Sequence, residues 1–196
     1  MSEHKNPGNL FISDVHIYGL DEAIKKAKYA MSTDVSTLTN ELTPGIKALA
    51  QSPKGEGHDN WLNGVIVQFD LTYTVKAWTE AERYHFLDFI CSQSTMHRLA
   101  SFDLNKQYDK HTDPRSIEIE KELIEKYLLS KDPEDYLRAL MSNPCGFRLT
   151  AAMTTNYRQL KTIYSQRLNH RLPEWRSLCK WIETLPHAEL IIGESK

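Results

Sequence analysis

The chain has 196 residues, a formal net charge of −2 and an apolar share of 40%. A chain of this length can fold as one domain around its own core, and its near-neutral charge gives no basic field that would attract nucleic acid. No apolar window is long enough for a spanning helix and no signal peptide is visible, so we expect no membrane partner.

Three widely spaced cysteines form no C-x-x-C pair, and no histidine stands at zinc-ligand spacing from them. This pattern is typical of a reducing compartment, so we expect a cytoplasmic protein without a bound metal. Residues 1–9 are expected to be disordered.

The first half of the chain predicts two helices and one strand. Residues 19–31 carry acids first and lysines later, as in a surface helix. Residues 44–64 contain several prolines and glycines, and the second half of this segment is expected to be an ordered loop. Residues 65–77, VIVQFDLTYTVKA, alternate apolar and polar side chains and predict a half-buried strand. Residues 78–93 predict a helix with a T-x-x-E capping box at Thr79 and Glu82.

The second half predicts four helices, at residues 113–130, 132–144, 153–168 and 172–185. Together with the strand, they predict an α+β fold in which a mostly antiparallel or mixed sheet packs with helices. We expect residues 1–196 to form a single domain, because no repeat or low-complexity segment divides them.

Polar side chains gather where the predicted helix at 78–93 ends. Gln93, His97 and Arg98 lie near that end, and Ser101 and Tyr108 follow. A guanidinium suits phosphate or carboxylate, and a histidine titrates near neutral pH. The alternative is that Gln93, His97 and Arg98 bind the carbonyls at the helix end and face water.

A second polar cluster lies on the predicted helix at 153–168. Asn156 and Arg167 are eleven residues apart, which at about 100° per residue places them on one face, with Leu160 and Ile163 between them. A guanidinium on the inner face of a helix needs an anion, because an unpaired buried charge is very costly. That anion is either a ligand or a carboxylate such as Glu174 in a structural ion pair.

Together the two clusters resemble the flavin-dependent thymidylate synthase family. That family's signature Q-x-x-R-H-R-x-x-S is similar to QSTMHRLAS at residues 93–101. Its later N-x-R-x-L motif, which precedes a further arginine, is similar to NYRQL at residues 156–160, followed by Arg167. The glycine-histidine loop and strand of the family resemble GHDNWLNGVIVQFDLTYTVKA, and order and spacing agree from about residue 57 to residue 185.

The resemblance implies a homotetramer with active sites between subunits. It also implies a deoxyuridylate-like pyrimidine nucleotide, FAD as cofactor, and methylene-tetrahydrofolate and NADPH as co-substrates. By position, the residues that would bind the nucleotide are Gln93, Ser101, Tyr108, Arg138 and Arg167. Ser101 and Arg167 would be the catalytic residues, and the residues that would bind the flavin are His97, Arg98, Asn156 and Arg158.

The chain departs from the family pattern at several of its polar positions. Met96 stands at the first arginine of the signature, Gly64 at a histidine, and Thr162 at a second asparagine. Leu140 replaces an arginine, with Arg138 two residues away, and the stretch after Ser101 is one residue shorter and lacks the family's Glu, Ser and Arg. The sequence therefore predicts a divergent flavin-dependent methylase, with a nucleotide-binding protein without redox chemistry and a purely structural protein as alternatives.

Overall fold

The computed structural model describes residues 11–53 and 55–193, so the disorder expected for residues 1–9 lies outside the described part of the chain. At its centre is a four-stranded antiparallel sheet in the order β1-β2-β4-β3. Its strands are β1 Ile12–Tyr18, β2 Ile66–Thr74, β3 Asp88–Ser92 and β4 Arg148–Asn156. The predicted α+β class is confirmed, and the sheet is antiparallel.

Strand β2 forms because its alternating sequence gives it one apolar face. Val67, Phe69, Leu71 and Tyr73 are buried, whereas the polar residues between them are half-buried on the other face. Its nine residues pair with all nine residues of β4, from Ile66 opposite Asn156 to Thr74 opposite Arg148. The predicted strand is confirmed, and it lies in the interior of the sheet.

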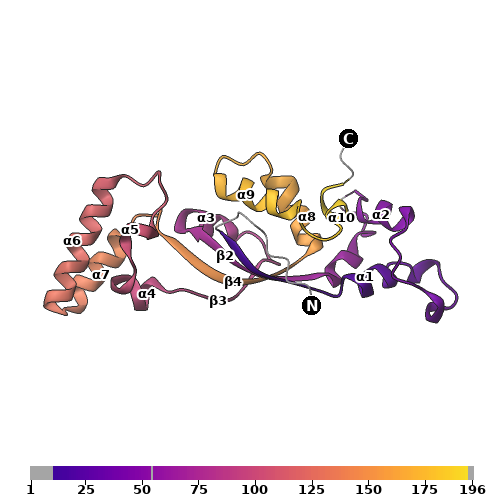
Figure 1. Ribbon diagram of the computed structural model, residues 1–196, viewed down its shortest axis with the longest axis horizontal. Coiled ribbons are helices and arrows are strands. Elements are labelled where there is room, and N and C mark those ends of the chain that lie inside the picture. Colours follow the sequence, from indigo (N-terminus) through magenta and orange to yellow (C-terminus); the bar gives the residue numbers. More distant parts are fainter. Residues whose placement is uncertain (1–10, 54, 194–196) are drawn as a thin grey trace.

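Helices α8 Tyr157–Arg167, α9 Pro173–Ile182 and α10 Glu189–Ile192 lie over the apolar face of the sheet (Figure 1). Two tryptophans of α9 hold this layer to β2. The rings of Trp175 and Tyr73 lie 5.3 Å apart, and those of Trp181 and Phe69 lie 4.8 Å apart. Trp175 is fully buried, which makes it a core residue.

The two ends of the molecule are formed by helices outside this layer (Figure 1). At one end are the short elements α1 Leu20–Lys26, η1 Tyr29–Met31, η2 Val35–Thr37, α2 Pro44–Ala50 and η3 Asn60–Gly64. At the other end are α4 Thr95–Arg98, η4 Leu99–Ser101, α5 Leu104–Gln107, α6 Pro114–Ser130 and α7 Pro133–Ser142. Leu99, Ile124, Ala139 and Phe147 form a small second core there.

The helices predicted at 113–130, 132–144 and 172–185 are confirmed as α6, α7 and α9. The helix predicted at 19–31 is interrupted, since α1 ends at Lys26. The proline-rich start of the segment 44–64 forms α2, because Pro44 occupies the first turn, where its missing N–H costs nothing.

The prediction of one helix over residues 78–93 is wrong. The chain forms α3 Val75–Ala81, then a turn, then the edge strand β3. The cap of α3 is Thr74, whose Oγ1 accepts the Ala77 N–H at 3.2 Å, whereas the Thr79 hydroxyl donates to the Lys76 carbonyl. The expected capping box therefore does not start a helix.

The helix predicted at 153–168 begins later, because residues 153–156 belong to β4. The β-branched pair Thr154 and Thr155 continues the strand, and Asn156 starts α8 by capping it. Asn156 and Arg167 therefore do not share one continuous helix.

Among the described residues, no helix is long and apolar enough to cross a membrane.

Candidate functional site

The first cavity, which we call the α8 cavity, has a volume of about 400 Å³. It lies between η3, the start of α8 and the turn that follows α3. Asn156 and Arg158, both predicted to bind flavin, line it together with Thr162, and the turn contributes Arg83 and His85.

Asn156 is fixed at the bottom of this cavity by its role as the N-cap of α8. Its Oδ1 accepts the Gln159 N–H at 2.8 Å, and the residue is buried. This bond uses the carbonyl side of the amide. The Nδ2 side donates to no other described residue, so it is available to a ligand acceptor.

Arg158 and Lys161 share one carboxylate, that of Asp59 in the loop before η3. Arg158 Nε lies 3.0 Å from Asp59 Oδ1, and Lys161 Nζ lies 2.9 Å from Oδ2. Burial works against the charge of Asp59, but hydrogen bonds and charges from Lys161 and Arg158 outweigh it and lower the pKa of Asp59. The carboxylate is therefore ionised, and the group of three carries a net positive charge.

The turn after α3 adds two basic side chains that the sequence interpretation missed. Arg83 and His85 line the α8 cavity and form no ion pair with another described residue. The sequence RYH at 83–85 was the available signal, but the incorrect helix prediction placed it on a helix face. The lining of the α8 cavity holds the guanidiniums of Arg83 and Arg158 and, among the described residues, one carboxylate, that of Asp59, so the cavity suits an anionic ligand.

Arg167 is buried outside this cavity, with partners from its own chain. Its Nε donates to Tyr84 Oη at 2.7 Å, its Nη1 lies 3.2 Å from Glu80 Oε2, and its guanidinium lies 4.6 Å from the Trp175 ring centroid. The predicted need for an anion is thus met by Glu80. The suggested partner Glu174 is wrong, because its carboxylate accepts the Thr74 N–H at 2.7 Å.

Glu80 binds more than one cation. Lys76 Nζ lies 3.3 Å from Oε1, and His170 Nε2 lies 3.2 Å from Oε2, the oxygen that also faces Arg167. Burial opposes ionisation, but Lys76, His170 and Arg167 together lower the pKa of Glu80. The ion pair of Arg167 is therefore formed at neutral pH.

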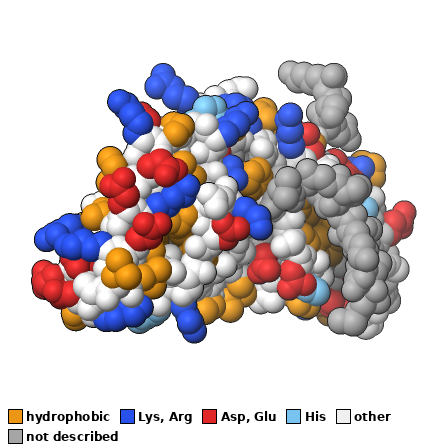
Figure 2. Space-filling view, turned by 60° about the vertical axis from the view of Figure 1, so that its left-hand side comes forward, with side chains coloured by type: hydrophobic (Ala, Val, Ile, Leu, Met, Phe, Trp, Pro, Cys, Tyr) orange, Lys and Arg blue, Asp and Glu red, His pale blue; other side chains and the backbone are white. Residues whose placement is uncertain are grey.

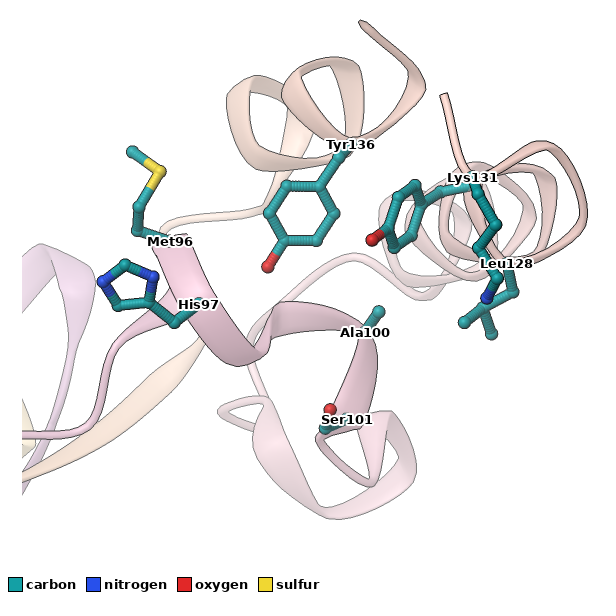
Figure 3. Close-up of a pocket in the computed structure, with 8 residues that line it drawn as sticks. Met96, His97, Ala100, Ser101, Leu128, Lys131 and Tyr136 are labelled. Carbon is teal, nitrogen blue, oxygen red and sulfur yellow. The ribbon is translucent and has the colours of Figure 1, made fainter. Parts of the chain in front are cut away.

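The second cavity, which we call the hairpin cavity, has a volume of about 360 Å³ and lies between α4–η4 and the α6–α7 hairpin (Figure 3). His97 and Ser101 line it, as does Met96. His97, Ser101 and the neighbouring Arg98 are all exposed, and Arg98 forms no ion pair with another described residue.

Gln93 follows β3 and not the end of a helix. Its N–H donates to the Thr150 carbonyl and its Oε1 accepts the Thr150 N–H, both at 2.9 Å, so the side chain extends the β3–β4 pairing. The expectation that Gln93 lies at a helix end, beside the carbonyls there, is therefore wrong.

Tyr108 and Arg138 line neither cavity. The Tyr108 hydroxyl donates to Asn143 Oδ1 at 2.9 Å, and burial, with the Glu120 carboxyl nearby, raises its pKa. Arg138 is exposed on α7 and lies 3.7 Å from Asp135. Within one chain the predicted site residues thus occur in two separate cavities and in positions outside both.

The surface shown in Figure 2 mixes acidic and basic side chains, so no field of a single sign covers it. In the described part of the chain, no three His, Cys, Asp or Glu side chains are grouped to hold a metal ion, and the three cysteines are free thiols.

Comparison with known proteins gives a result only at the level of structure. No protein-family model and no curated protein sequence matches the chain. The flavin-dependent thymidylate synthase ThyX from Helicobacter pylori, solved with FAD and dUMP, is similar with a TM-score of 0.72 at 16% identity, over 95% of this chain and 100% of that one. The UMP/dUMP methylase PolB from Streptomyces cacaoi, bound with 5-Br dUMP, is similar with a TM-score of 0.62 at 18% identity, over 88% and 89%.

The structural match extends beyond residues 57–185, where the sequence resemblance was found. The resemblance is confirmed at the level of the fold, since identities this low carry the fold alone. The chain has the fold of the flavin-dependent thymidylate synthases.

Proposed function

We propose that the protein is a divergent flavin-dependent methylase of a pyrimidine deoxynucleotide such as deoxyuridylate. The observation that carries this proposal is the cationic α8 cavity, which joins Asn156 and Arg158 on a fold shared with ThyX. The ThyX structure contains FAD and dUMP, and PolB is a UMP/dUMP methylase.

The residues of the α8 cavity fit FAD. The Arg83 and Arg158 guanidiniums suit its diphosphate, and the Asn156 amide can donate to a ring carbonyl. A volume of about 400 Å³ holds one part of so large a cofactor. The remainder would lie against a second protomer in the proposed homotetramer, where His97 and Arg98 would contact it.

NADPH would reduce the flavin, the reduced flavin would supply the hydride and methylene-tetrahydrofolate the carbon, while the chain binds and orients them. In this proposal Gln93, Ser101, Tyr108, Arg138 and Arg167 contact the nucleotide, with Ser101 and Arg167 next to the reacting base. Arg167 would do so through the N–H groups that Tyr84 and Glu80 leave free, or after an oxygen of the nucleotide replaces Glu80 at its guanidinium.

A second candidate is a protein of the same fold that binds a nucleotide without redox chemistry. Two observations favour it. Met96 removes a cation from the signature, and Glu80 already neutralises Arg167. The missing arginine and the Glu80–Arg167 ion pair both lower the positive charge that is available to bind the phosphates of a flavin and of a nucleotide.

Thermal unfolding in the presence of FAD and of dUMP distinguishes the two candidates. A ligand at a hundredfold excess over its Kd stabilises the folded chain by about 2.7 kcal/mol. Stabilisation by both ligands supports the methylase, and by dUMP alone the second candidate. No stabilisation by either ligand would leave only a structural protein.

Two variants test whether the flavin binds in the α8 cavity. Arg158→Gln should abolish stabilisation by FAD, because it removes a cation that lines the cavity. Lys180→Gln removes the same charge from the exposed last turn of α9 and should retain it. Equal responses of the two variants would contradict this assignment.

A further inference from the structure

The hairpin cavity has basic and hydroxyl-bearing side chains and, among the described residues, no carboxylate in its lining. Lys131 and Tyr136 come from the α6–α7 hairpin, and His97 and Ser101 come from the facing α4–η4 segment (Figure 3). Tyr127 of α6 completes the polar lining.

One of these groups has a structural role. The Tyr136 hydroxyl donates to the Thr95 carbonyl at 2.8 Å and accepts the Leu99 N–H at 3.2 Å. It therefore holds α4 against the hairpin and sets the width of the cavity.

The side chains of His97, Ser101, Tyr127 and Lys131 make no hydrogen bond or ion pair with another described residue. Each of them can donate a hydrogen bond, and Lys131 carries a full charge. Because no acceptor from the cavity lining meets them, this set of groups is complementary to a ligand rich in acceptor oxygens.

The backbone fixes the place of Lys131. It is the C-cap of α6, with a left-handed φ of 56°, and its N–H donates to the Tyr127 carbonyl at 2.8 Å. Its ammonium lies 5.6 Å from the centroid of the Tyr127 ring and donates no hydrogen bond to another described residue, so its N–H groups are available to an anion.

The acids nearest in sequence have other partners. Asp132 accepts the Glu134 N–H at 3.0 Å at the start of α7. Asp135 lies 2.6 Å from Lys126 Nζ and also accepts the Ser130 hydroxyl. Neither of them lines the cavity, so the charge of Lys131 is not cancelled there.

We propose that the hairpin cavity binds the phosphate of a mononucleotide, with Lys131 as its ion-pair partner and Ser101 and Tyr127 as hydrogen-bond donors, beside the His97 that the proposed function assigns to the flavin. This inference rests on the proposed function, which supplies the nucleotide. It assigns to the hairpin a binding cation in a chain that has Met96 where the signature has an arginine.

Binding of dUMP and of the uncharged nucleoside deoxyuridine, measured by titration calorimetry on the full chain, tests this assignment. Lys131→Gln keeps the length of the side chain and removes its charge, and it should weaken dUMP binding at least about tenfold without changing deoxyuridine binding. Lys131→Arg should restore most of the affinity for dUMP.

Lys121→Gln is the matched control. It removes the same charge from the same helix, at a lysine that pairs with Glu118 at 2.8 Å and does not line the cavity. It should leave dUMP binding unchanged. A Lys131→Gln variant that binds dUMP as the wild type does, an equal loss in both glutamine variants, or a wild type that does not bind dUMP would overturn the inference.

The proposed function and this inference fail in different ways. If the chain ignores FAD while Lys131→Gln still weakens dUMP binding, the methylase is wrong and the phosphate site stands. If FAD stabilises the chain and Lys131→Gln binds dUMP normally, the phosphate site alone is wrong.

Discussion

Glu120 is a fully buried carboxyl without a hydrogen-bond partner among the described residues. Burial raises its pKa to about 7, so it is protonated in the folded chain at acidic pH. A group whose pKa is raised by folding stabilises the folded state below its unfolded pKa, and this stability is lost as the pH rises through the folded value.

The free energy of unfolding should therefore fall between about pH 4.5 and pH 8 in the wild type. Glu120→Gln should remove this dependence and be more stable at pH 8 by about 3 kcal/mol, as a shift of one pKa unit corresponds to about 1.4 kcal/mol. Urea unfolding at several pH values measures it. Glu122→Gln, at an exposed position of α6, is the control. A Glu120→Gln variant with the pH dependence of the wild type would contradict this explanation.

Glu80 is the anion that pairs with Arg167. Removing the charge of Glu80 should change both the stability of the chain and its affinity for dUMP. Glu80→Gln leaves a buried guanidinium with Tyr84 as its main partner, which should destabilise the chain by about 3 kcal/mol. If Arg167 also binds the nucleotide, the variant should bind dUMP more tightly, because no carboxylate competes for the guanidinium. Chemical unfolding and dUMP titration measure the two effects.

The exposed neighbour Glu82 supplies the control, Glu82→Gln. Because the pKa of Glu80 is lowered, its contribution to stability is present at neutral pH and is lost as the pH falls through the lowered value. A Glu80→Gln variant as stable as the wild type would show that this ion pair is not needed, and an unchanged dUMP affinity would argue against Arg167 as a nucleotide ligand.

Among the helices, α3 is capped by a different residue from the one that the sequence predicts. The sequence predicts a cap at Thr79, whereas the structure has Thr74 as the cap. Thr74→Ala should cost about 1–2 kcal/mol, because it removes the cap of Ala77 and a hydrogen bond to Glu174. Thr79→Ala should cost less than about 0.5 kcal/mol, since its hydroxyl only donates to a carbonyl on an exposed turn. A larger loss for Thr79→Ala would mean that the helix starts where the capping box predicts.

The elements that the sequence predicts correctly are those with a complete local signal. Strand β2 alternates over its whole length, and α6 and α7 each begin with an Asp-Pro pair that caps them. The other strands have no such signal. All five residues of β3 are exposed, and β4 reads RLTAAMTTN without alternation, so only their pairing with distant strands makes them strands.

The same limit applies to the candidate site. Asn156 and Arg158 are found from the sequence because a local motif joins them at the start of α8. Arg83 and His85 are missed, since a turn between distant elements brings them to the α8 cavity. Lys131 is missed because it ends a helix whose acidic face resembles an ordinary solvated surface.

Across the whole chain, members of the two predicted polar clusters line two separate cavities: His97 and Ser101 line the hairpin cavity, and Asn156 lines the α8 cavity. In the homotetramer that we propose, one protomer would contribute its α8 cavity to the active site and another its hairpin cavity. The Arg158→Gln and Lys131→Gln variants should each have lowered methylase activity. Mixed and reassembled subunits of the two variants should regain part of it, because some sites then combine two intact cavities.

Gel filtration of the wild type should show an assembly larger than a monomer. If mixing restores no activity although mixed assemblies form, the two cavities do not belong to one shared site.

Flavin binding by this chain is tested most simply by the absorbance spectrum of the protein between about 350 and 500 nm, recorded after addition of FAD and removal of unbound cofactor. We predict a retained flavin spectrum in the wild type and its loss in Arg158→Gln. A colourless wild type that leaves all added FAD free would contradict flavin-dependent chemistry on this fold.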